Sequence, residues 1–190
     1  MEEVLQLTRV EAGHLQVHLK PLALVPFLGS LLEVMRLEWS ADVRPLQLHG
    51  GPDEPLVWAD PDLLEIVVRN LLENARKYSP AGGAIDVSVE EAGNPDHVLV
   101  RVIDHGPGIP AALLEPIFDR FSRGIRSSSE WTRGYGLGLY IAREIIRAQQ
   151  GEIWAENQGD GACFLFTLWA AQDDPIPPGA EAAAPREDTR

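Results

Sequence analysis

Two pairs of short segments, each joined by a tight turn, constrain the fold of this 190-residue chain most strongly. Residues 84–90 and 97–104 alternate apolar and polar side chains on either side of a Gly-Asn-Pro-Asp turn at 93–96, and residues 152–157 and 162–169 flank a Gly-Asp-Gly turn at 159–161. Alternating segments joined by so few residues pair as antiparallel hairpins. They favour an α+β layer sandwich over a doubly wound parallel sheet.

Helical spacing of apolar residues fills the intervals between the expected strands. The segment 61–78 has the strongest start signal, because Asp60 can cap its free amides and Pro61 suits the first helical position. Further helices are expected over 2–13, 21–39 and 137–150, with Gly151 closing the last. Additional strands are expected over 15–19, 43–48 and 56–58.

Composition excludes several classes of function. Sixteen Lys and Arg against 29 Asp and Glu give a net charge of −13, which argues against nucleic acid as the main partner. No apolar run approaches the roughly 18 residues of a membrane helix, and no secretion signal opens the chain. We therefore expect a cytoplasmic location. The single cysteine, Cys163, excludes an intrachain disulfide and a multi-cysteine metal site.

Polar side chains follow one stripe of the expected 61–78 helix. Spacings of four and three residues place Asn70, Asn74 and Lys77 on the same face, among strongly apolar neighbours. A buried asparagine is costly without a hydrogen-bond partner. The stripe therefore indicates either a polar task or asparagines that satisfy nearby backbone groups.

A carboxylate followed by glycines marks the end of the expected 97–104 strand. Asp104 can accept a hydrogen bond from an exocyclic amine, and Gly106 and Gly108 would let the backbone approach a flat ring. A simple turn is the alternative.

A second glycine cluster, Gly134, Gly136 and Gly138, opens the expected helix at 137. Free amides at a helix N-terminus form an anion site, although the spacing matches neither the dinucleotide fingerprint nor the P-loop. Residues 118–147 hold six arginines and three acidic residues, a local charge of +3 that suits phosphates. Helix capping and a solvated basic face are the alternatives.

The order of these motifs resembles one family. An Asn-x-x-x-Asn-x-x-Lys stripe, an Asp-x-Gly-x-Gly turn, Phe-Asp-Arg-Phe at 118–121 and Gly-x-Gly-x-Gly-Leu resemble the N, G1, F and G2 boxes of sensor histidine kinases. The resemblance covers about residues 15–168. It implies a Bergerat-type ATP-binding fold, a two-layer α/β sandwich whose mixed, mostly antiparallel sheet is covered by helices on one face.

The resemblance also implies a division of the chain and a role for each motif. Residues 1–13 resemble the end of the second dimerisation helix, 14–170 form the ATP-binding catalytic domain, and 171–190 are expected to be a disordered tail. Asn74 would ligate Mg²⁺ beside Asn70, and Asp104 would accept from the adenine amine. Lys77 would reach a phosphate, and Arg123 or Arg120 would stabilise the γ-phosphoryl charge. The other expected ATP-binding residues are Tyr78, Gly106, Gly108, Ile109, Phe121, Gly134, Gly136, Leu137, Gly138 and Leu139.

Asn70 separates a kinase from a hydrolase within this resemblance, because gyrase-type ATPases carry a general-base Glu at that position. The expected acceptor is a histidine on a dimerisation hairpin, with a response regulator downstream. The five histidines of the chain, His14, His18, His49, His97 and His105, do not precede Asp or Glu, as the family's acceptor usually does. We therefore expect the acceptor in trans or in a longer parent, which could be anchored in a membrane, and no autophosphorylation in cis. A nucleotide-binding module without phosphotransfer and an anti-sigma-type serine kinase are the alternatives.

Overall fold

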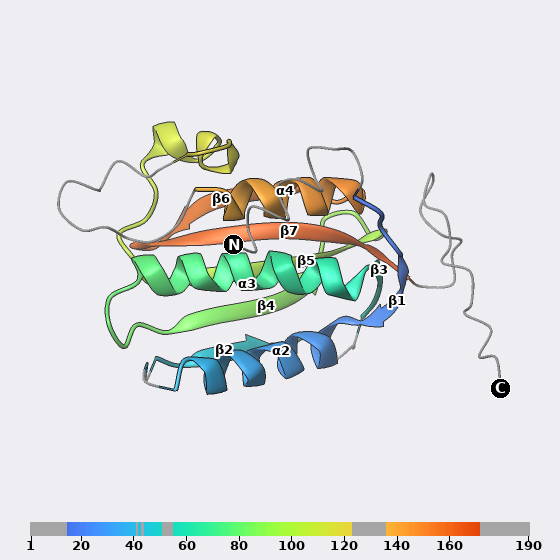
Figure 1. The fold of residues 1–190 in the computed structure, drawn as a ribbon, viewed down its shortest axis with the longest axis horizontal. Coiled ribbons are helices and arrows are strands. Elements are labelled where there is room, and N and C mark those ends of the chain that lie inside the picture. The colour runs from blue at the N-terminus through green and yellow to red at the C-terminus, as the bar shows by residue number, and fades with distance from the viewer. Residues whose placement is uncertain (1–14, 41, 43, 51–54, 123–135, 172–190) are drawn as a thin grey trace.

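The computed structural model describes residues 15–40, 42, 44–50, 55–122 and 136–171, and Figure 1 shows how their helices and strands are arranged. The strands are β1 (Lys20–Ala23), β2 (Leu46–His49), β3 (Leu56–Ala59), β4 (Ile85–Glu91), β5 (His97–Asp104), β6 (Ile153–Gln158) and β7 (Gly161–Ala170). The helices are α2 (Leu24–Glu38), α3 (Pro61–Tyr78) and α4 (Gly138–Ala148), with short 3₁₀ turns η1 (Ala111–Leu113) and η2 (Pro116–Phe118).

Within the described residues these strands form one sheet in the order β1-β3-β7-β5-β4-β2, and β6 pairs with β7. The β2–β4 pair is parallel, and the other pairs are antiparallel. Both expected hairpins are present, as β4–β5 and β6–β7. The expectation of a mixed, mostly antiparallel sheet is therefore confirmed.

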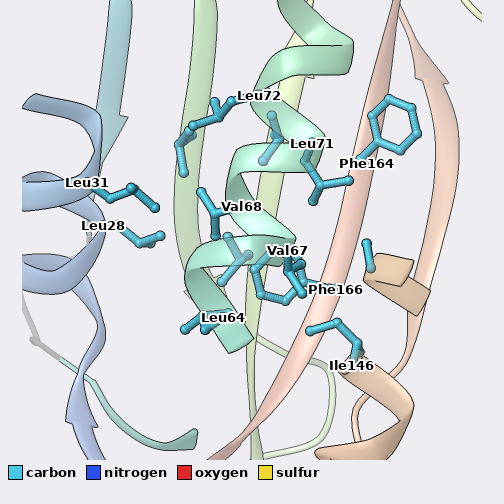
Figure 2. Close-up of a cluster of buried hydrophobic side chains, with 14 of the residues drawn as sticks. Leu28, Leu31, Leu64, Val67, Val68, Leu71, Leu72, Ile146, Phe164 and Phe166 are labelled. Carbon is cyan, nitrogen blue, oxygen red and sulfur yellow. The ribbon is translucent and has the colours of Figure 1, made fainter. Parts of the chain in front are cut away.

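The helices cover one face of this sheet, as Figures 1 and 2 show. Strand β5 displays the two-layer pattern directly, since Val98, Val100 and Val102 are buried while the residues between them are partly exposed. Side chains from α2, α3, α4 and the sheet form one apolar core. In Figure 2, Leu28 and Leu31 of α2 and Phe164 and Phe166 of β7 lie on either side of α3.

Local signals predict α3 well and the start of the sheet poorly. Helix α3 spans the expected residues, and Asp60 Oδ1 caps it by accepting from the amides of Asp62 and Leu63 at 3.1 and 3.2 Å. The expected strand at 15–19 is wrong, because the strand is β1, and α2 begins at Leu24 instead of residue 21. Pro21 is tolerated in β1, opposite Trp58, because β1 is an edge strand.

Two expected segments, the helix at 2–13 and the tail beyond Ala171, lie outside the described residues. Among the helices that are described, none is long and apolar enough to cross a membrane.

Candidate functional site

Helix α3 contacts both of the expected glycine motifs. A carbon added at Gly138 would lie 2.6 Å from Asn70 Oδ1, so the start of α4 touches the polar stripe of α3. A carbon added at Gly106 would lie 2.7 Å from the Tyr78 carbonyl oxygen and 2.8 Å from Asp104 Oδ1. The glycines at both places allow backbone and polar side chains to approach closely.

The polar stripe of α3 lies beside its buried face, on the side that the start of α4 approaches. Asn70 and Asn74 are partly buried, and Lys77 and Tyr78 are exposed at the end of the helix. The Lys77 ammonium nitrogen lies 4.9 Å from the centre of the Tyr78 ring. The buried face consists of Leu64, Val67, Val68, Leu71, Leu72 and Ala75. The asparagines are therefore held by a helix fixed in the core.

Asp104 is a buried carboxylate at the end of β5, with an exposed fraction of 3%. Its Oδ1 accepts hydrogen bonds from the Gly106 amide at 2.7 Å and the Ala162 amide at 3.3 Å. Burial raises the pKa of this carboxyl, and the two amides partly offset that rise. Both of these bonds use Oδ1.

Sequence reasoning missed Asn157, which holds the loop after Asp104. Its Oδ1 accepts from the Ile109 amide at 2.7 Å, and its Nδ2 donates to the Ile109 carbonyl at 2.8 Å. A signal for it exists in β6, where Ile153, Ala155 and Asn157 share the helix-covered face and only the last is polar. Its partner, however, lies 48 residues away.

The segment around the expected Phe-Asp-Arg-Phe motif is held to α4 and β7. Phe118 is buried and meets Phe164 edge to face, with ring centres 6.3 Å apart. Asp119 pairs with Arg143 of α4 at 3.2 Å. Phe121 is 63% exposed and has a positive φ of 58°.

Several arginines of the basic segment contact protein groups. The Arg120 guanidinium lies 5.0 Å from the centre of the Tyr140 ring, and Arg147 pairs with Glu144 at 3.5 Å. Arg123, Arg126, Arg133 and Gly134 lie outside the described residues. The expected phosphate contacts of Arg123 and Gly134 therefore stay predictions.

The start of α4 has the features of an anion site. Gly136 adopts φ +70°, and a carbon added there would lie 3.0 Å from the Ser122 carbonyl oxygen. Among the described residues no side chain caps the helix at Leu137, and the amides of a first helical turn suit an anion. Leu137 is buried and Leu139 packs against the core, which fixes the helix start.

A divalent cation at this site would rely on amide oxygens. Among the described residues no group of three or more His, Cys, Asp or Glu side chains could hold a metal. The Asn70 and Asn74 amide oxygens are hard donors of the kind that Mg²⁺ accepts together with substrate phosphates. The residues present thus fit a cation that is shared with a polyphosphate.

Known proteins share this fold and sequence. Residues 59–172 match the family described as Histidine kinase-, DNA gyrase B-, and HSP90-like ATPase. The chain is 38% identical over 169 residues to the adaptive-response sensory kinase SasA of Synechocystis sp., and 32% identical over 170 residues to the sensor histidine kinase WalK of Bacillus subtilis. Each match covers 88% of this chain. Full-length ShkA, solved in complex with AMPPNP, superposes with a TM-score of 0.76 at 25% identity over 90% of this chain and 35% of ShkA.

The chain belongs to this family of histidine kinase-like ATPases, and it carries a histidine kinase catalytic fold that binds ATP. It spans 43% of the length of SasA and 28% of the length of WalK.

Proposed function

We propose that this chain is the catalytic domain of a sensor histidine kinase, which binds ATP with Mg²⁺ and donates the γ-phosphoryl group to a histidine on a dimerisation hairpin. The hairpin would be supplied in trans or by a longer parent protein. The observation that carries the proposal is that α3 contacts both glycine motifs, at Gly138 through Asn70 and at Gly106, beside Asp104, through Tyr78.

Adenine would bind beside Asp104. The buried carboxylate is held by two amides on Oδ1, so Oδ2 can accept from the exocyclic amine, a donor that guanine lacks at that position. Gly106 and Gly108 keep the adjacent backbone free of side chains, and Ile109 and Tyr78 would flank the base. Because the carboxylate is buried, the hydrogen bond would be strong.

The phosphates would lie between α3 and the start of α4. Backbone amides at the start of α4, around Gly136, Leu137 and Gly138, would donate to phosphate oxygens. Lys77 would add a positive charge. Asn74 and Asn70 would hold Mg²⁺, which would neutralise charge on the phosphates. Arg123, or Arg120 from its place over Tyr140, would stabilise the transferring group, and Leu139 and Phe121 would line the site.

Phosphotransfer is favoured over hydrolysis by the residue at position 70. An amide cannot take a proton from water at neutral pH, so Asn70 cannot activate a hydrolytic water. A γ-phosphoryl group that water does not attack efficiently remains for a positioned acceptor. Loss of that acceptor would instead leave a nucleotide-binding regulatory module, and a serine acceptor would make the chain an anti-sigma-type kinase.

The partners follow from the proposed reaction. A response regulator would take the phosphoryl group from the histidine, and the catalytic domain would work in the cytoplasm, where ATP is available.

A transfer assay tests the proposal. A separate hairpin protein with its histidine would be incubated with the chain and [γ-³²P]ATP. We expect acid-labile label on the hairpin, and none with Asn74→Ala. Acid-stable label would favour the serine kinase, and ATP binding without any transfer would favour the regulatory module.

A further inference from the structure

The β6–β7 hairpin forms a wall behind Asp104. The Ala162 amide donates to Asp104 Oδ1, and a carbon added at Gly161 would lie 1.8 Å from the Asp104 carbonyl oxygen. Asn157 pairs with Ala162 across the hairpin, so its side chain projects from the same face. One hairpin therefore contacts both the carboxylate and the loop that follows it.

Asn157 fixes this loop through both backbone groups of one residue. The two bonds to Ile109, at 2.7 and 2.8 Å, set the distance and the orientation of the peptide together. A carbon added at Gly108, where φ is +68°, would lie 2.9 Å from Asn157 Oδ1. The loop thus passes so close to Asn157 that the preceding residue has no room for a side chain.

We propose that Asn157 is a positioning residue for purine recognition, which holds the 105–109 loop at the distance from Asp104 that an adenine ring requires. The inference rests on the proposed function, because it assumes that adenine binds at Asp104. Without the two hydrogen bonds between Asn157 and Ile109, the nucleotide itself would have to order the loop. The free energy of ordering the loop would then reduce the affinity for ATP.

The hydrogen bonds between Asn157 and Ile109 should strengthen binding of the base and not binding of the phosphates. Asn157 contacts the loop beside Asp104, whereas the phosphates are expected at α3 and the start of α4. Its loss should therefore weaken adenine nucleotides and spare inorganic tripolyphosphate. A general loss of folded protein would weaken both ligands equally, and this difference separates a positioning role from a structural one.

The test compares Asn157→Ala with Asn94→Ala. The Asn94 side chain, like that of Asn157, accepts a hydrogen bond from a backbone amide, that of Asp96 at 3.0 Å. Asn94 lies in the β4–β5 turn and not beside the 105–109 loop. Calorimetry would give the Kd of ATP and of tripolyphosphate for each variant. We expect Asn157→Ala to raise the Kd of ATP on the order of tenfold, since two hydrogen bonds are lost, with tripolyphosphate unchanged and Asn94→Ala like wild type.

Other outcomes overturn the inference in distinct ways. Equal ATP affinity in Asn157→Ala and Asn94→Ala, or a parallel loss of ATP and tripolyphosphate, would refute the positioning role while leaving the proposed function intact. Failure of the wild-type chain to bind ATP would refute the proposed function itself. Should Asn157→Ala not fold, Asn157→Asp, which keeps the acceptor for the Ile109 amide and loses the donor, is expected to weaken ATP binding by a smaller factor.

Discussion

The burial of Asp104 suits the proposed contact with adenine, but it lowers the stability of the protein without a ligand. Its burial raises the pKa of the carboxyl, because the charged form loses hydration that two amides only partly replace. Between the ordinary and the raised pKa, the folded state binds more protons than the unfolded state. The stability of the empty protein therefore falls as pH rises through this window, and the cost persists at neutral pH.

Asp104→Asn should consequently separate binding from stability. We expect ATP affinity to fall about tenfold or more, because a hydrogen bond to a charged acceptor contributes roughly 1.5–3 kcal/mol. The empty variant should unfold at the same denaturant concentration as wild type or a higher one at pH 7, since its amide oxygen can still accept from Gly106 and Ala162.

The pH dependence provides the matching control for that variant. Wild-type ATP affinity should decrease as acid protonates Asp104, whereas the affinity of the variant should vary less over the same range. A variant that binds ATP as wild type does would contradict the adenine assignment.

Gly138→Ala tests the contact between α4 and α3. Alanine favours a helix over glycine by about 1 kcal/mol, yet its Cβ would lie 2.6 Å from Asn70 Oδ1 and must displace that side chain. We expect thermal stability close to wild type and a clear loss of ATP–Mg²⁺ affinity. Gly93→Ala, whose added carbon meets nothing within 4 Å, is the control. If both substitutions left binding intact, the close approach at Gly138 would have no functional role.

Residues that belong to local motifs could be predicted, and residues that act across the sheet could not. Asn70 and Asn74 are recognisable from their spacing within one helix. Asp104 is recognisable from the two glycines that follow it closely in the sequence. Asn157 acts on Ile109 through the pairing of β6 with β7, which no local pattern shows. The contact of Arg120 with the Tyr140 ring, 20 residues away, is equally non-local.

At the scale of elements, the N-terminus of α3 is joined to the end of α4 and to the segment before β1. Asp60 Oδ2 accepts from the His18 amide at 2.9 Å, and the Asp60 amide donates to Gln149 Oε1 at 2.8 Å. Gln149 is fully buried, with 0% exposure. The helix that carries the asparagine stripe is thus anchored at the end far from the site.

Gln149→Ala should destabilise the fold measurably. It leaves the buried Asp60 amide without its acceptor, which costs about 1–3 kcal/mol in the free energy of unfolding. Gln47→Ala, at an exposed position of β2, is expected to change that free energy by less than about 0.5 kcal/mol. Urea titrations of both variants would measure the difference, and equal midpoints would show that the buried bond contributes nothing.

Element boundaries were predictable where both ends carry their own signals. Helix α3 has Asp60 and Pro61 at its start and the Ser79-Pro80 sequence after its end, so its limits follow from the sequence. Strand β1 has no such markers. Alternation at 15–19 suggested a strand, but strand formation depends on a partner, and β3 pairs with residues 20–23 instead.

At the scale of the whole molecule, β7 joins the two halves of the sheet, β1–β3 and β5–β4–β2. It pairs with β3, β5 and β6, although it is the last described strand of the chain. The fold class was predictable because hairpins and helices alternate in a recognisable order. The long-range pairing of β7 with β3 and β5 was not, because nothing local specifies it.

Truncations should reveal that the fold depends on β7. A chain that ends at Ala171 keeps every described strand and should melt cooperatively, near the temperature of the full chain. A chain that ends at residue 160 loses β7, so β5 has a bare edge and Asp104 loses the Ala162 amide. We expect no cooperative thermal transition and no ATP binding in the shorter chain. A folded, ATP-binding chain of 160 residues would contradict the central place of β7.

The position of β7 also determines when during its synthesis the protein can first hold a nucleotide. Both α3 and β5 leave the ribosome well before residues 161–170, but the wall behind Asp104 is absent until those residues pair with β5. Such late, long-range pairing delays folding relative to local contacts. ATP can therefore stabilise this fold only after residues 161–170 have been synthesised, and the edge of β5 that pairs with β7 is uncovered until then.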